Sequence, residues 1–147
     1  MATKSSIEHL NSFLRGEIAA VETYQLALQK IDHISTTRDE LLVNLKSHED
    51  RVMTLQDAIR ALGGEPVESS GPWGTFAKAV ERSAKAFGEK AAVAALEEGE
   101  DHGLKDYKGD LEGLDFEAKA LVQDLLLPQQ QQTHDRVSAL KHRLQRA

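Results

Sequence analysis

Apolar residues recur at alternating steps of three and four positions through most of this chain. In the N-terminal part they are Ile7, Leu10, Leu14, Ile18, Val21, Leu28 and Ile31. This spacing puts side chains on one face of an α-helix. The pattern therefore predicts long helices that each bury one stripe, and no strand pattern is evident.

Short motifs predict where these helices begin and end. A capping box at Ser5-x-x-Glu8 predicts the start of the first helix, which should end near residues 33–35. A second box, Thr37-x-x-Glu40, predicts the start of the next helix. The run from Gly63 to Pro66 predicts its end, because glycine supplies a left-handed cap and proline cannot continue a helix.

The rest of the chain is predicted to form one loop, one turn and three further helical segments. They are a loop over 66–73, a short helix over 75–87, a long helix over 90–111, a turn over 112–115 and a last helical region over 116–144. Pro128 predicts a kink or a break in that region. The fold class is therefore all-α: a four-helix bundle with ferritin-like connectivity, in one domain over 1–147. Its hairpins are 5–64 and 90–146, joined by a crossover over 65–89.

Composition limits the chemistry that such helices can carry. The chain has no Cys, which excludes disulfides, thiolate metal sites and Cys nucleophiles. Its net charge of −6 opposes binding to nucleic acid. No apolar stretch approaches the roughly 20 residues that cross a bilayer, and no signal-peptide core is evident. We expect a cytoplasmic protein, with no membrane or nucleic-acid partner, whose chemistry rests on carboxylates, His and Tyr.

Several polar residues interrupt the apolar stripes. They are Glu17 and Tyr24 in the first helix, His48 in the second, and Glu97, Glu100 and Tyr107 in the third. His134 lies at the flank of the last stripe. Burying an unpaired carboxylate costs several kcal/mol or forces it to take up a proton. A metal cation is one partner for this set, and a hydrogen-bonded network closed on itself is the alternative.

The two halves of the chain also resemble each other. Gly16-Glu17 and Tyr24 recur as Gly99-Glu100 and Tyr107, 83 residues later in both cases. Asp50-Arg51-Val52-x-x-Leu55 recurs as Asp135-Arg136-Val137-x-x-Leu140, 85 residues later. This repeat predicts a duplicated helical hairpin with pseudo-twofold symmetry. It pairs His48 with Thr133, and Glu49 with His134.

These motifs, together with the Leu62–Pro66 helix end and Thr133-His134-Asp135-Arg136, carry a resemblance that spans nearly the whole chain. The chain resembles the ferritin-like superfamily and, more narrowly, an uncharacterised bacterial family described only as a domain of unknown function. The resemblance implies a four-helix bundle and a metal site, with no established activity to inherit.

Ferritin-like di-iron sites use a Glu from each of two helices and a Glu-x-x-His from each of the others. Carried over, the resemblance implies the metal ligands Glu17, His48, Glu49, Glu97, Glu100 and His134, with Tyr24, Tyr107 and Gln131 around them. The chain departs from the pattern at Leu45 and Gln131, where Glu would precede each His by three residues. Iron is the favoured ion, zinc or manganese are alternatives, and a protein without metal stays open.

Two functions follow from these observations. The first is a ferritin-like metal-binding protein, with one or two ions, that handles metal or oxidative stress. The second is a non-catalytic oligomerisation or partner-binding module with a buried Glu-Tyr-His hydrogen-bond network. We expect a homo-oligomer, with a dimer favoured. The sequence does not decide whether the protein is an enzyme, nor does it identify a small-molecule partner.

Overall fold

The computed structural model describes residues 2–31, 35–109 and 111–146, and these residues contain helices and no strand. The all-α prediction is therefore confirmed for this part of the chain. The elements are α1 (Ala2–Leu28), α2 (Thr36–Ala61), a 3-10 turn (Gly71–Trp73), α3 (Gly74–Phe87), α4 (Glu89–Lys108), α5 (Phe116–Leu121), a π-helical turn (Val122–Leu126) and α6 (Leu127–Arg146).

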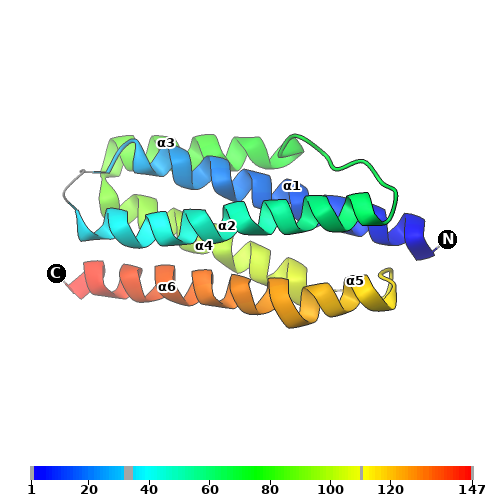
Figure 1. Ribbon diagram of the computed structural model, residues 1–147. Coiled ribbons are helices and arrows are strands. Elements are labelled where there is room, and N and C mark those ends of the chain that lie inside the picture. Colours follow the sequence, from blue (N-terminus) through cyan, green and yellow to red (C-terminus); the bar gives the residue numbers. More distant parts are fainter. Residues whose placement is uncertain (1, 32–34, 110, 147) are drawn as a thin grey trace.

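The long helices lie side by side along one axis (Figure 1). α1 packs most extensively on α2, and α4 packs most extensively on α6, so each pair forms a hairpin. α3 lies along α1 and α4 and covers the side away from α6 (Figure 1). α1 begins at one end of the molecule, and α6 finishes at the opposite end.

The starts of the first two helices differ from prediction. α1 begins at Ala2, so the box predicted at Ser5 lies inside the helix. α1 ends at Leu28, and residues 32–34, where part of its predicted end falls, lie outside the described residues. Ser35 caps α2, because its extended backbone lets its hydroxyl accept the Thr37 N–H at 3.1 Å. The box predicted at Thr37 was therefore wrong by two residues.

The end of α2 follows the predicted glycine cap. Gly63 has φ +82°, which glycine adopts without a steric penalty. Its N–H donates to the Arg60 carbonyl at 2.9 Å, and the Gly64 N–H donates to the Ile59 carbonyl at 2.9 Å. These two bonds form a Schellman motif, which satisfies carbonyls that the helix end would otherwise leave unpaired.

Pro128 lies in the first turn of α6 and does not break the last helical region, which forms a π-helical turn just before it. Asp115 caps the region by accepting the Ala118 N–H at 2.8 Å. The Leu127 N–H then donates to the Val122 carbonyl, five residues back, in the wide turn just before Pro128. A π-helical turn of this kind re-pairs the backbone where the ladder is interrupted. The helix continues through Pro128 to Arg146.

The apolar core is divided into two clusters. One contains Leu10, Leu14, Leu55, Ile59, Val122 and Leu126, and the other contains Leu28, Leu41, Val93, Leu96, Val137 and Leu140. Along α1, α2 and α6, six buried polar residues fall between these clusters: Glu17, Asn44, His48, Arg51, Gln130 and Thr133. The fold therefore places a polar layer at mid-length, closed by apolar packing on both sides.

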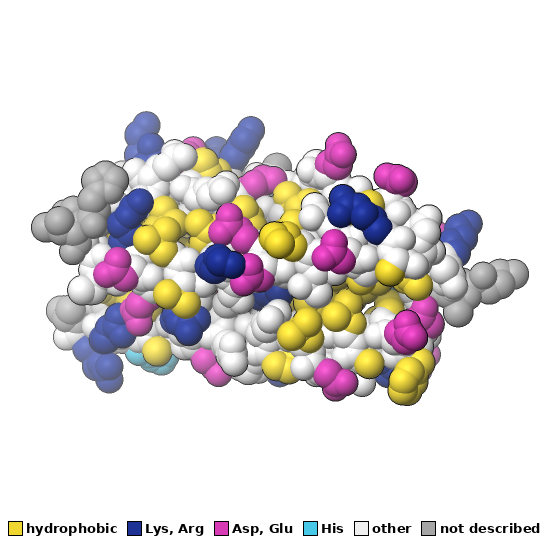
Figure 2. Space-filling view, viewed as in Figure 1, with side chains coloured by type: hydrophobic (Ala, Val, Ile, Leu, Met, Phe, Trp, Pro, Cys, Tyr) yellow, Lys and Arg dark blue, Asp and Glu magenta, His cyan; other side chains and the backbone are white. Residues whose placement is uncertain are grey.

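The outer surface mixes charges of both signs with scattered apolar side chains (Figure 2). Isolated exposed apolar residues, such as Met53 and Phe116, are ordinary on soluble domains and need no special role. No helix within the described residues has both the length and the apolar character to cross a membrane.

The repeated glycines give a first prediction. A Cβ on Gly16 would meet nothing within 4 Å, whereas one on Gly99 would lie 2.9 Å from a ring carbon of Phe76. Replacing a helical Gly by Ala stabilises by roughly 0.5–1 kcal/mol where space allows. Gly16→Ala should therefore raise the free energy of unfolding in urea by about that amount. Gly99→Ala should gain nothing or lose stability, and an equal gain in both variants would contradict this packing.

Candidate functional site

The polar layer is built around three of the expected residues, Glu17 on α1, His48 on α2 and Glu100 on α4. Each side chain is at most 5% exposed. His48 Nδ1 lies 3.1 Å from Glu17 Oε1, and His48 Nε2 lies 2.6 Å from Glu100 Oε1. The imidazole ring therefore lies between two carboxylates that come from different helices.

Both ring nitrogens of His48 face carboxylate oxygens, so both must donate for the geometry to be satisfied. Only the imidazolium form has two N–H donors. Burial opposes protonation, but the charges of Glu100 and Glu17 outweigh it and raise the pKa of His48 above its ordinary value of 6.5. The contact of 3.4 Å between Arg51 Nη2 and His48 Nε2 then brings two donors together and is not a hydrogen bond.

Arg51 of α2 supplies a second buried cation. Its side chain has no exposed surface, and its Nε lies 3.2 Å from Glu17 Oε2. Its two terminal nitrogens donate to the Gln130 side-chain oxygen and, at 3.1 Å, to the Thr133 hydroxyl. The planar guanidinium group thus joins α1, α2 and α6 in one arrangement, which a single ammonium group could not reproduce.

Glu100 is the most completely bonded acceptor in the layer. Its Oε1 accepts from the Tyr24 hydroxyl at 2.8 Å as well as from His48. Its Oε2 accepts from Gln130 Nε2 at 2.9 Å and from the Thr133 hydroxyl at 2.7 Å. Burial opposes ionisation, but His48, Thr133 and Arg51 outweigh it and lower the pKa of Glu100 below its ordinary value of 4.5.

Asn44 closes the network on the side of α6. Its side-chain nitrogen donates to the Tyr24 hydroxyl and to the Thr133 carbonyl oxygen, each at 3.0 Å. Its side-chain oxygen accepts from Arg136 at 2.8 Å. Two carboxylates, an imidazolium and a guanidinium therefore balance in charge, and neutral groups fill the remaining hydrogen-bonding positions of Glu100 and Arg51.

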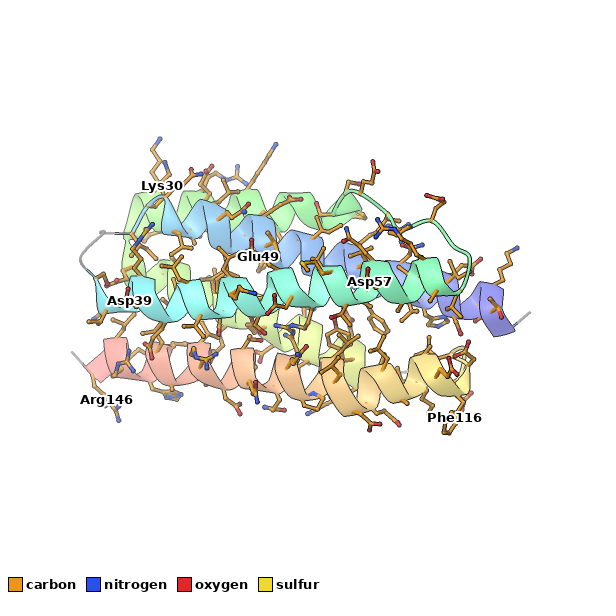
Figure 3. All side chains as sticks on the ribbon, in the orientation of Figure 1. Lys30, Asp39, Glu49, Asp57, Phe116 and Arg146 are labelled. Carbon is orange, nitrogen blue, oxygen red and sulfur yellow. The ribbon has the colours of Figure 1, made fainter. Side chains whose placement is uncertain are left out.

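The other expected metal ligands do not join this layer. Glu97 pairs with Lys141 at 2.9 Å near the surface, and that bond lowers the pKa of Glu97. Glu49 is exposed on α2 (Figure 3). His134 lies 2.6 Å from Asp101 and 3.3 Å from Asp135, while Gln131 donates to Asp135. The prediction that Glu97 lies at the same site as Glu17, His48 and Glu100 was wrong, because Glu97 lies on an adjacent face of α4.

The donor set does not fit a ferritin-like two-metal centre. The ring of His48 separates Glu17 from Glu100, and its two nitrogens point to opposite sides. An ion on one nitrogen would thus meet one carboxylate only. Arg51 already supplies the positive charge beside Glu17. Among the residues that the structure describes, no group of three or more His, Asp or Glu side chains is arranged to hold a metal ion.

Only one of the two repeated Tyr residues takes part in the hydrogen-bond network. Tyr24 bonds Glu100 and Asn44, but the hydroxyl of its repeat partner Tyr107 is buried without a hydrogen-bond partner among the described residues. Burial and then the charge of Glu17 raise the pKa of Tyr107 well above its ordinary value. Tyr24 therefore has the predicted role of supporting a carboxylate, and Tyr107 does not fill it.

Asn44 and Arg51 are absent from the predicted site, although the sequence contained a signal for them. An apolar stripe with steps of three and four runs along α2 through Leu45 and Val52, whereas the buried line runs through Asn44, His48 and Arg51. Both lines fit steps of three and four. The Asp-Arg-Val repeat marked Arg51, but nothing in one sequence shows which copy of a repeated Arg lies inside. Gln130 and Thr133 lie on the line that leads back from Leu140 and Val137 in steps of three and four.

The charge state of the layer gives a pH prediction. The raised pKa of His48 contributes stability that is full below pH 6.5 and is lost as pH rises through the folded value. The lowered pKa of Glu100 contributes stability that is full above pH 4.5 and is lost as pH falls. Both contributions should therefore be greatest between these two values. Above pH 6.5, the unfolding free energy should fall by at most about 1.4 kcal/mol per pH unit until His48 has lost its proton in the folded protein.

Urea unfolding at a series of pH values measures this. His48→Gln should be less stable but should lose most of the fall above pH 6.5. The remainder comes from His134, where partial burial opposes protonation but the carboxylates of Asp135 and Asp101 outweigh it and raise the pKa. His142→Gln, at an exposed position on α6, is the matched control and should keep the whole fall. The same alkaline fall in His48→Gln as in the unchanged protein would show that another group causes it.

Comparison with known proteins identifies a family for this chain but no activity. No curated protein and no solved structure matches the chain significantly. Residues 5–112 match the family described as Domain of unknown function (DUF2383). This range includes Glu17, His48, Arg51 and Glu100. Since it spans more than half of the sequence, the chain belongs to this uncharacterised family.

Proposed function

We propose that the protein is a non-catalytic, metal-independent binding module built on a ferritin-like four-helix bundle. The bundle is supported by the two hairpins, α1 with α2 and α4 with α6, that pack around one polar layer. The crossover between them carries α3, as ferritin-like connectivity requires. In this proposal the polar layer fixes how the helices pair, and the protein binds its ligand or partner around that layer.

The observation that carries the proposal is the position of Arg51. Its guanidinium group is fully buried, contacts Glu17 and reaches Gln130 and Thr133. A permanent cation thus stands beside the carboxylate that a metal centre would use. Removing one partner of such a buried pair typically costs about 3–5 kcal/mol, because the other charge is left uncompensated.

The bonding of the layer supports a binding role over catalysis. A catalytic acid or base needs a position within hydrogen-bond reach of the substrate proton. Both oxygens of Glu100 and both nitrogens of His48 already bond to other side chains of the chain. Such fully paired groups rigidify a core and specify one helix pairing.

Metal binding remains the second candidate, and one observation favours it. Glu17, His48 and Glu100 come from three helices and lie within hydrogen-bond distance of one another through His48. A single ion could recruit part of this set if Arg51 moved away. The dimer that the sequence analysis expects stays a prediction, which a measurement of the oligomeric state in solution tests.

Arg51→Met tests the proposal, with Arg136→Met as the matched control from the repeat. Arg51→Met should lower the unfolding free energy by about 3–5 kcal/mol. Arg136 is only half-buried and donates to Asn44, so its loss should cost about 1 kcal/mol. Arg51→Lys keeps the charge without the planar fork and should lie between them, which allows the comparison if Arg51→Met does not fold.

Elemental analysis of protein purified without an affinity tag separates the two candidates. The unchanged protein should contain no stoichiometric iron, zinc or manganese, and its melting temperature should not respond to these ions or to a chelator. Arg51→Met should instead gain stability with added zinc, because Glu17 has lost its cation. One bound ion in the unchanged protein, lost in Glu17→Gln and kept in Glu97→Gln, would overturn the proposal in favour of a metal centre.

A further inference from the structure

A cavity of about 60 Å³ lies beside the polar layer, between α1 and α4 and next to Phe76 of α3. Its lining extends from the buried Glu17 to Asp106, which is exposed at the surface. One water molecule needs roughly 10–15 Å³ of such space. The cavity therefore has room for a molecule of about four to six non-hydrogen atoms.

Gly16 accounts for part of this space. It lines the cavity, and a Cβ placed on it would have no neighbour within 4 Å. Its repeat partner Gly99 lines the same cavity, but there Phe76 fills the space that the missing side chain leaves. On the side of α1, the space next to Glu17 is therefore unfilled.

The cavity holds polar groups with unused hydrogen-bonding capacity. Tyr107 lines it and is 2% exposed, and its hydroxyl has no partner among the described residues. Glu17 also lines it and, among the residues that the structure describes, accepts from His48 and Arg51 alone, whereas Glu100 accepts four bonds. The charge of Glu17 acts on Tyr107, yet no hydrogen bond joins them. A small donor between these two groups would satisfy both.

The lining favours a positive ligand over a negative one. Carboxylates of Glu17, Glu100 and Asp106 contribute to it, and no Lys or Arg does. His48, which also lines the cavity, and Arg51, behind Glu17, offset two of these charges. Asp106, at the exposed end beside His102, supplies the third carboxylate. The rings of Phe13 and Phe76 supply apolar walls whose faces attract cations.

We propose that this cavity binds a small organic ammonium ion, a primary amine with a short alkyl chain. Its ammonium group donates to Glu17 and to the Tyr107 hydroxyl oxygen, and its alkyl part packs against Phe13 and Phe76. The site deepens the proposed function and rests on it in one respect, that no metal ion occupies Glu17.

Titration with n-propylammonium chloride tests the site, with 1-propanol and propionate as uncharged and negative analogues of the same size. Binding is followed by amide chemical shifts, in a chelator-containing buffer free of amines. The amides of Gly16, Gly99 and Gly103 line the cavity and should shift in a saturable way. A ligand of this size should bind with a Kd of about 0.1–10 mM, and 1-propanol at least tenfold more weakly.

Three variants and a control locate the ligand. Gly16→Leu fills the void and should abolish binding. Tyr107→Phe should weaken it about tenfold and still fold, since it removes only an unpaired hydroxyl. Glu17→Gln should also weaken it, and Glu97→Gln, outside the cavity, should not.

Equal shifts with 1-propanol, unchanged binding in Gly16→Leu and Tyr107→Phe, or no saturable shift at all would each overturn the site and leave a water-filled void. Binding that appears only when the chelator strips a metal ion would overturn the metal-independent function and leave the ammonium site standing.

Discussion

A guanidinium group with no exposed surface is the constraint on which the rest of this structure depends. Arg51 can lie inside the protein because Glu17 neutralises its charge and because Gln130 and Thr133 accept hydrogen bonds from its terminal nitrogens. Those acceptors are on α6, and the carboxylate is on α1. At the middle of this molecule, the same contacts therefore fix how the helices pair, balance the buried charges and pack the side chains.

The same requirement explains why the layer is placed between two apolar clusters. Charges attract most strongly where water is absent, and they are most costly there when unpaired. The clusters on both sides of Glu17, His48 and Glu100 exclude water from the ends of the layer. The void next to Tyr107 is the place where this closure is incomplete, since polar groups meet unfilled space there.

The fold was largely predictable because its signals are local. Steps of three and four, the Gly63 cap and the proline-containing crossover depend on neighbours in the sequence, and they predicted the helices to within a few residues. Helix starts were less certain because Ser35 and Thr37 are both good caps by composition, and the extended backbone at Ser35 selects it as the cap of α2. The site was predicted in part: Glu17, His48 and Glu100 meet, but Glu97, Glu49 and His134 do not. A stripe read to within one residue cannot tell the inner face of a helix from its flank, and a single residue separates Glu97 from Leu96, which lies on the buried line with Glu100.

The π-helical turn at Val122–Leu126 bears on chain length. The buried positions of the last helical region are 118, 122, 126, 130, 133, 137 and 140. Three successive steps of four drift away from the 3.6-residue period of an α-helix, and the wide turn absorbs that drift. The turn accommodates one extra residue, so that Ala118 and Gln130 both face inward. The segment before Pro128 is thus where this chain could lose one residue without turning Thr133 away from Glu100, because regular α-helix would replace the wide turn.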